Sequence, residues 1–232
     1  MVALQEVSLG QHITLTAKDG HTLGAYRADP AGAPKGAIVV IQEIFGVNSH
    51  IRNVADRFAQ DGYVAIAPAL FDRQEKNFQS GYSPDEIANA RKFIAKPDWD
   101  AMLRDTQAAV DAVKSAGPVA VIGYCMGGSV AFLAATRASD VACAVGYYGG
   151  AIVKFADEKP KVPVMLHFGA KDQGIPLTDV EAIRSKRPDM EIYVYDEAGH
   201  GFNCDERGSY DKGSADIALT RTRDFLAKHM KK

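Results

Sequence analysis

The chain has 232 residues, and its 27 lysine and arginine residues against 29 aspartate and glutamate residues give a formal net charge of −2. This balance provides no basic surface for a nucleic acid or an anionic membrane, so we expect neither as a partner. Three cysteines are an odd number, which argues against a secreted disulfide framework, and no targeting signal is visible. We therefore expect a cytoplasmic protein, a monomer of one domain spanning residues 1–232.

Short runs of β-branched and other apolar residues recur along the chain and predict strands. Most of these runs are apolar throughout, as is typical of strands that are covered on both faces of a sheet. The predicted strands lie at residues 13–16, 37–41, 64–67, 119–122, 141–147, 164–168 and 192–195.

Helical patterns lie between these strands. One begins after Ser49 and ends at Gly62, and a second opens with Ser83 as N-cap and Pro84 at the first helical position. Amphipathic stripes at residues 99–113 and 217–230 predict two more helices. The alternation predicts an α/β fold with a mostly parallel, twisted sheet of about seven to eight strands and helices on both faces.

The turn after strand 119–122 has residue types that fit a nucleophile. It reads Gly123-Tyr-Cys125-Met-Gly127 and leads into a helix, which is the form of a nucleophile elbow with cysteine in place of serine. Side chains two residues to either side of Cys125 would crowd so sharp a turn, hence the two glycines. The helix N-terminus favours negative charge on the sulfur. The alternative is a small buried cysteine in a tight turn.

A cysteine nucleophile needs a base, and the base needs a group that orients it. Asp172 follows strand 164–168 and His200 follows strand 192–195, in the chain order nucleophile, acid, histidine. The sequence therefore predicts Cys125, Asp172 and His200 as a catalytic triad. A turn-forming aspartate and a structural histidine are the alternatives for the last two residues taken singly.

Glu43 lies just beyond the apolar strand 37–41, where a carboxylate must be paired or solvated. If it faces Cys125, its negative charge disfavours ionisation of the thiol and keeps the resting sulfur slow to oxidise. The alternative is a structural ion pair with an arginine such as Arg52.

Five ordered segments resemble the dienelactone hydrolase family over nearly the whole chain: QEIFGVN at 42–48, GYCMGG at 123–128, VGYYGG at 145–150, HFGAKD at 167–172 and EAGHGF at 197–202. The resemblance implies an α/β-hydrolase fold in which Cys125, Asp172 and His200 are the triad. It also implies that Glu43 holds the resting thiol and takes its proton when substrate binds.

By the same resemblance, the backbone N–H groups of Ile44 and Met126 form the oxyanion hole. The family also binds a substrate carboxylate with two arginines, one in the helix before the elbow and one four residues after the histidine. In this chain Cys204 stands at the second position, and the first falls near Ile87 with Arg91 one turn further on.

Three arginines could substitute in binding the substrate: Arg91, Arg207 and Arg73. For each of them the alternative is a solvated surface arginine. Tyr147 is a further candidate for the substrate-binding residues at the pocket rim, with packing in the core as its alternative.

These residues predict cysteine-dependent hydrolysis of a small-molecule lactone or carboxylic ester through a thioester intermediate. Because thiolate is a good leaving group, enol lactones and activated esters are favoured over amides. We expect no cofactor, since neither nucleotide-binding glycine motif is present, and no metal, although His200 and Cys204 are four residues apart.

Two other functions have a sequence feature in their favour. A class I glutamine amidotransferase also carries cysteine at an elbow, but that group places a glutamate two residues after its histidine, where this chain has Phe202. A thiol-based binding or redox-sensing protein on a hydrolase scaffold is the second alternative, because Cys204 lies near His200 and the family's arginines are displaced.

Overall fold

A single sheet of eight strands runs through the computed structural model, which describes residues 10–231, in the order β1-β2-β4-β3-β5-β6-β7-β8. The strands are β1 (Gln11–Thr16), β2 (Thr22–Ala28), β3 (Ala37–Ile41), β4 (Val64–Pro68), β5 (Val119–Tyr124), β6 (Cys143–Tyr147), β7 (Val164–Gly169) and β8 (Glu191–Tyr195). Strands β3 to β8 pair in parallel, whereas β2 pairs antiparallel with both β1 and β4. The predicted mostly parallel sheet is confirmed.

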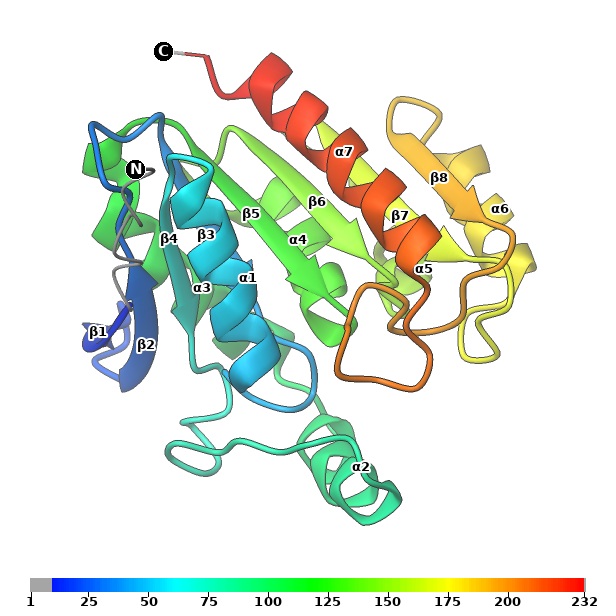
Figure 1. Ribbon diagram of the computed structural model, residues 1–232, viewed down its shortest axis with the longest axis horizontal. Coiled ribbons are helices and arrows are strands. Elements are labelled where there is room, and N and C mark those ends of the chain that lie inside the picture. The colour runs from blue at the N-terminus through cyan, green and yellow to red at the C-terminus, as the bar shows by residue number, and fades with distance from the viewer. Residues whose placement is uncertain (1–9, 232) are drawn as a thin grey trace, which may run out of the picture.

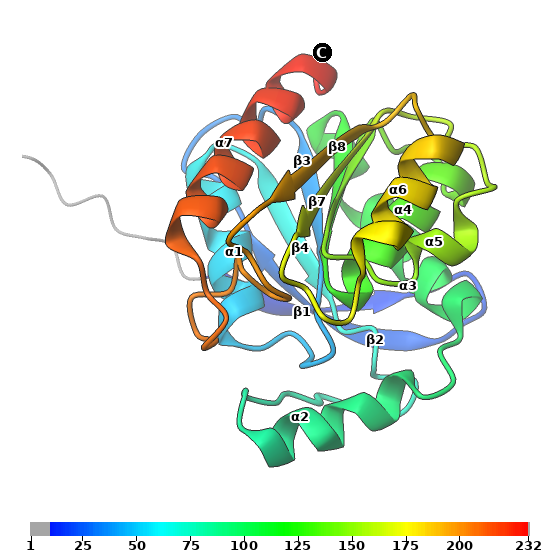
Figure 2. The same cartoon turned by 90° about the vertical axis from the view of Figure 1, so that its right-hand side faces the viewer.

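Helices cover both faces of the sheet (Figures 1 and 2). Helices α1 (Ser49–Gln60) and α7 (Lys212–His229) lie on one face, and α3 (Trp99–Val113), α4 (Met126–Arg137), α5 (Ile152–Phe155) and α6 (Leu177–Lys186) lie on the other. Helix α2 (Pro84–Ala90) and the 3₁₀ turn Arg91–Ile94 lie beyond the ends of the strands. Helix α7 begins five residues before the predicted stripe because Asp211 caps it.

The core lies on both sides of the sheet because the central strands are buried on both faces. Along β3, Ile38 and Val40 pack toward one layer of helices, while Val39 and Ile41 pack toward the other. Among residues 10–231, no helix combines the length and the apolar character that crossing a membrane demands.

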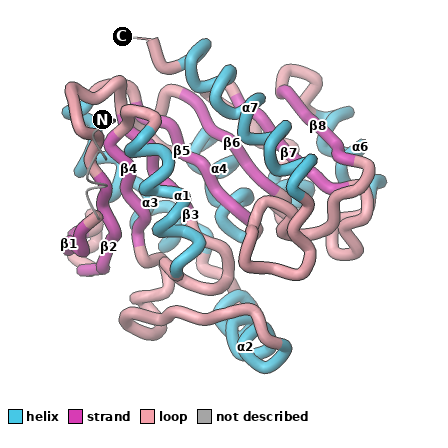
Figure 3. Tube along the Cα trace, viewed as in Figure 1, coloured by secondary structure: helices cyan, strands magenta, loops and turns pink. Residues whose placement is uncertain are grey.

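The carboxyl ends of the parallel strands lie side by side, and the loops that follow them carry the functional residues. The register pairs Ile41 of β3 with Gly123 of β5, Tyr124 with Tyr147 of β6, and Gly169 of β7 with Tyr195 of β8. The loops that follow these strands therefore gather at the same end of the sheet, with α2 beside them (Figures 1 and 3).

Candidate active site

Cys125 occupies the sharp turn between β5 and α4. Its backbone has φ 55° and ψ −120°, a conformation that side-chain-bearing residues rarely adopt and that costs about 1–3 kcal/mol. A Cβ atom on Gly123 would lie 1.8 Å from the Gly127 carbonyl oxygen, and one on Gly127 would lie 2.5 Å from the Ile41 carbonyl oxygen. The two glycines are therefore required for the turn, which is held by a hydrogen bond from the Cys125 N–H to the Tyr147 carbonyl at 3.0 Å.

His200 stands between the other two predicted triad residues. Its Nε2 lies 3.1 Å from Cys125 Sγ and its Nδ1 lies 2.7 Å from Asp172 Oδ2. The second oxygen of Asp172 accepts hydrogen bonds from the backbone N–H groups of Gly174 and Ile175 at 2.8 and 3.2 Å, which fixes the carboxylate. The structure thus brings together three side chains from the ends of β5, β7 and β8.

The charges around His200 decide its protonation. Burial disfavours the charged ring, but the sulfur of Cys125 and the carboxylate of Asp172 more than offset this effect and raise the pKa of His200 to about 10. The ring of Tyr148 lies 5.2 Å from the imidazole ring, and Ser209 Oγ donates to the His200 carbonyl oxygen. The site therefore favours an imidazolium that faces a thiol and a carboxylate.

Glu43 is buried in the loop after β3, with 1% of its side chain exposed. Its Oε1 accepts a hydrogen bond from Arg207 Nη1 at 3.1 Å. The alternative partner Arg52 lies elsewhere, because its guanidinium donates to the Val47 carbonyl and to Gln79. Burial lowers the pKa of Arg207, but the charge of Glu43 and its neighbours outweighs burial and raises it, so the guanidinium stays charged.

Arg207 lines the same cavity as Cys125 and His200. Its guanidinium lies over the rings of Phe45 and Tyr82, at 5.6 and 5.8 Å from their centroids. Gly201 has φ +77°, and a Cβ atom there would lie 2.3 Å from Arg207 Nη1. The family places an arginine four residues after the histidine, where this chain has Cys204, and Arg207, seven residues after His200, binds Glu43 instead.

The loop that holds Glu43 and Ile44 is fastened to the body by buried polar groups. Gln42 Nε2 donates to the Glu43 carbonyl, and Gln42 Oε1 accepts from the Leu70 N–H. Gly46 lies so close to Phe78 that a Cβ atom would be 2.0 Å from the Phe78 carbonyl oxygen. The hydrogen bonds of Gln42 before the loop and the close packing of Gly46 after it therefore fix the loop conformation.

A cavity of about 440 Å³ opens at the triad. Cys125, His200, Ile44 and Met126 line it together with apolar residues of α2 and its surroundings. Because Met126 opens α4, its N–H is one of the first-turn donors without an intrahelical acceptor.

Three cationic residues also line the cavity: Arg91, Lys154 and Arg207. The lining includes no aspartate or glutamate, and within residues 10–231 neither Arg91 nor Lys154 forms an ion pair. Lys154 was missed by sequence analysis because α5 is a four-residue helix without a motif.

Two predicted substrate-binding candidates lie outside this cavity. Tyr147 is buried beneath the site, where its hydroxyl lies 2.7 Å from Thr222 Oγ1, so packing accounts for it. Arg73 donates to Asp105 and Asp19 on the other side of the molecule, which makes it a structural ion pair.

Cys204 does not join His200 in a ligand set. In the part of the chain that the structure describes, the group of side chains close enough to hold a metal ion is Glu43, His50 and Cys204.

Known proteins resemble this chain along most of its length. The profile of the dienelactone hydrolase family matches residues 23–230. A carboxymethylenebutenolidase of Pseudomonas putida is 35% identical over 231 residues, which cover 94% of this chain and 97% of that protein, and one of Pseudomonas knackmussii is equally similar.

Solved structures share the fold. A Klebsiella pneumoniae protein named provisionally as a dienelactone hydrolase superposes with a TM-score of 0.81 at 32% identity, covering 94% of this chain and 99% of its own. An esterase of Pyrococcus furiosus superposes with a TM-score of 0.72 at 17% identity, covering 97% of this chain and 95% of its own. The α/β-hydrolase fold that the sequence predicted is thereby confirmed.

Proposed function

Because the chain belongs to the dienelactone hydrolase family and is a lactone or ester hydrolase, we propose that Cys125 is its nucleophile, activated by His200 and Asp172. The observation that carries this proposal is the position of His200, which contacts the sulfur with one ring nitrogen and the carboxylate with the other. This is the geometry that a nucleophile, its base and an orienting acid require.

In this mechanism His200 is an imidazolium that Asp172 stabilises, and the proton of the Cys125 thiol goes to Glu43 when substrate binds. The thiolate attacks the substrate carbonyl, and the N–H groups of Ile44 and Met126 bind the developing oxyanion. The leaving oxygen takes the proton from His200 and a thioester remains on Cys125. Water, deprotonated by His200, then hydrolyses the thioester.

Glu43 controls the resting state in this proposal. Arg207 neutralises Glu43 and also lines the cavity, so an anionic substrate competes with Glu43 for the same guanidinium. When the substrate draws Arg207 away, Glu43 takes the proton of the thiol, and it returns this proton to the sulfur after the thioester has been hydrolysed. Activation of Cys125 is thereby coupled to substrate binding.

We assign a carboxylate to the substrate because the cavity is lined by Arg91, Lys154 and Arg207 without an acidic residue. A cavity of about 440 Å³ fits a small molecule, such as an enol lactone that bears one carboxylate. A monomer in the cytoplasm stays our proposal for the assembly and the location.

The variant Cys125→Ala tests the nucleophile. Turnover of p-nitrophenyl acetate and of a carboxylate-bearing enol lactone should fall at least about 10³-fold, whereas the matched variant Cys143→Ala should keep it. Acid-quenched turnover of the wild type should add the mass of one acyl group to the peptide that carries Cys125. Unchanged hydrolysis in Cys125→Ala would sink the proposal.

The variant Arg91→Ala tests the carboxylate. Loss of one cation from the cavity should raise KM for the carboxylate-bearing lactone about tenfold and leave KM for the neutral ester unchanged. Lys92→Ala is the matched control, because Lys92 is the next residue but donates to Asn89 and does not line the cavity. Equal effects on both substrates would contradict recognition of a carboxylate by Arg91.

A further inference from the structure

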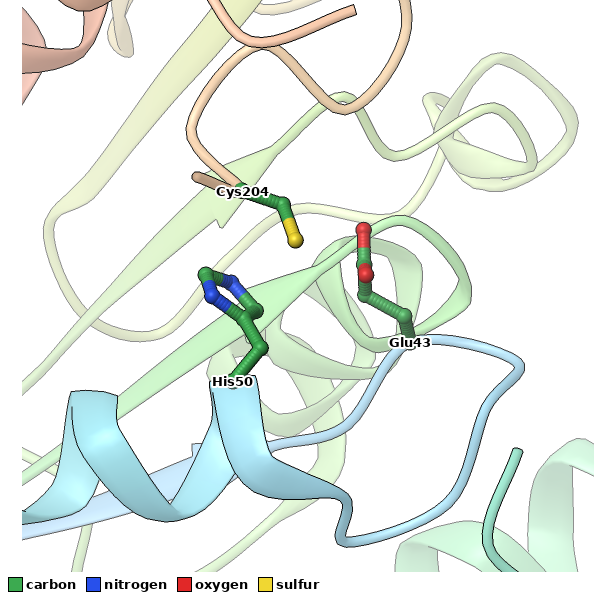
Figure 4. Close-up of side chains that lie close together, drawn as sticks. All are labelled: Glu43, His50 and Cys204. Atoms are coloured by element: carbon green, nitrogen blue, oxygen red, sulfur yellow. The ribbon is translucent and has the colours of Figure 1, made fainter. Parts of the chain in front are cut away.

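Three buried side chains converge behind the active site, and we call them the thiol cluster: Glu43, His50 and Cys204 (Figure 4). Glu43 comes from the loop after β3, His50 from the first turn of α1, and Cys204 from the segment between β8 and α7. Their exposed fractions are 1%, 0% and 0%. The stretch 43–50 and the distant segment after β8 thus bring a carboxylate, an imidazole and a thiol to one enclosed place.

Three polar atoms of the thiol cluster lack partners, whereas the thiol of Cys204 hydrogen-bonds to Tyr82 and to the backbone of Glu206. Glu43 Oε2 and both ring nitrogens of His50 are buried and have no hydrogen-bond partner among the described residues. The carboxylate oxygen Oδ1 of Asp205 lies 3.5 Å from His50 Nδ1, which is too long for a good hydrogen bond. Buried polar groups are almost always paired, and each orphan costs about 1–3 kcal/mol. So many orphans at one place indicate that something binds between them.

The donor atoms have the chemistry and the spacing of transition-metal ligands. Their distances from one another are all within 4.8 Å. Ligand atoms of a tetrahedral zinc site, with bonds of about 2.0–2.3 Å, lie roughly 3.3–3.8 Å apart, so small side-chain rotations close the set. We propose that Glu43, His50 and Cys204 form a binding site for a divalent transition-metal ion of the zinc class.

The charges of the three ligands match that of a divalent cation. Cys204 loses its proton on coordination, so a thiolate, a carboxylate and a neutral imidazole meet a dication. Glu43 Oε1 is already held by Arg207, which leaves Oε2 for the metal. Sulfur and imidazole ligands select zinc or cobalt over magnesium and calcium, which prefer oxygen. A fourth, exchangeable ligand completes the tetrahedron.

The site has a consequence for catalysis that rests on the proposed function. A metal ion on Oε2 fixes the carboxylate of Glu43 and prevents it from accepting the thiol proton. The metal-bound protein is therefore a hydrolase held in its resting state. The binding itself does not depend on this role, and it is tested without turnover.

Equilibrium dialysis of untagged, reduced Cys125→Ala protein against Zn²⁺ measures the binding, since this variant removes the catalytic thiol as a competing ligand. We expect one ion per chain. Cys204→Ser and His50→Asn, each made in the same background, should weaken the binding at least tenfold to 100-fold. Cys143→Ser and His12→Asn are the matched controls and should bind Zn²⁺ as before.

A second measurement does not depend on the folding of those variants. Addition of Co²⁺ to Cys125→Ala protein should produce the near-ultraviolet charge-transfer band of a cobalt–thiolate bond. Its absence would overturn the proposal, as would a zinc affinity that Cys204→Ser leaves unchanged in a folded protein. In either case the orphaned atoms bind water, and the proposed role of Cys125 in hydrolysis is untouched.

Discussion

Two histidines at the same end of the sheet have opposite surroundings. His167 in β7 is fully buried, and its ring nitrogens lie 2.9 Å from the Tyr195 hydroxyl and 3.1 Å from Thr222 Oγ1. His200, after β8, lies between a thiol and a carboxylate. Burial lowers the pKa of His167 to about 3, whereas burial is outweighed at His200, where the pKa is about 10.

The difference comes from the partners and not from the histidines. Hydroxyl groups satisfy the ring of His167 but do not compensate the cost of burying a charge, so this ring stays neutral. The sulfur and the carboxylate beside His200 compensate that cost. One residue type therefore has a structural role in β7 and is a candidate proton carrier after β8.

The largest effect should come from Asp172→Asn, which removes the carboxylate that distinguishes the two environments. The N–H groups of Gly174 and Ile175 will hold the amide oxygen, so the amide nitrogen must face His200. Nδ1 then accepts a hydrogen bond, Nε2 carries the only ring proton, and the imidazolium that stabilises the thiolate is lost. We expect kcat to fall about 10³- to 10⁴-fold in a steady-state assay.

Asp196→Asn is the control for this change, because Asp196 is exposed and lies in the segment after β8. It should leave kcat within about twofold of the wild type, as surface substitutions usually do. Similar losses in the two variants would remove Asp172 from the mechanism.

His167→Leu should instead reduce stability, by about 2–4 kcal/mol at pH 7, because the buried hydroxyl of Tyr195 loses its partner. The pKa of His167 is about 3 in the folded protein against 6.5 when unperturbed, so its neutral ring contributes stability above pH 6.5 that is lost as the pH falls toward 3. The variant has no such loss. Its deficit should therefore shrink by about 2–3 kcal/mol between pH 7 and pH 4.5 in urea unfolding.

Exposed His12 provides the comparison, since His12→Leu should change stability by less than about 0.5 kcal/mol at either pH. A deficit of His167→Leu that is the same at both pH values would show that folding does not shift the pKa of His167.

The smallest effect concerns the pKa of His200 itself. In Cys125→Ala the sulfur is gone while burial and the hydrogen bond to Asp172 remain, so the pKa should lie below that of the wild type. Ring nitrogen and proton chemical shifts followed by NMR titration measure this value, and His167 should give no transition above pH 5 in the same spectra. A His200 pKa that is unchanged by the loss of sulfur would contradict the pairing.

Sequence analysis located the strands and the elbow well because their signals are local. Continuous apolar runs mark strands that are buried on both faces, and Gly123 and Gly127 mark the tight turn. Strand β2 was missed because Gly24 and Arg27 interrupt its apolar residues. It is an antiparallel strand next to the edge strand β1, and polar residues are tolerated in such strands.

The surroundings of the candidate site were harder to predict because they depend on contacts across the chain. Arg207 meets Glu43 from a segment 164 residues away, and no spacing rule encodes that approach. His50 is the second residue of a surface-type helix, and only the packed structure shows that it points inward toward Cys204 (Figure 4). The motifs of a single sequence do not reveal such contacts.

Thr222 of α7 lies within hydrogen-bond distance of both Tyr147 and His167, which belong to neighbouring central strands. Thr222 therefore links the last helix to the middle of the sheet. Lifting α7 would expose two buried polar side chains at once, so the helix and the strands beneath it must open as a single cooperative unit. The slowest-exchanging amide protons of β6 and β7 will therefore report on the seating of a helix that contributes no residue to the chemistry.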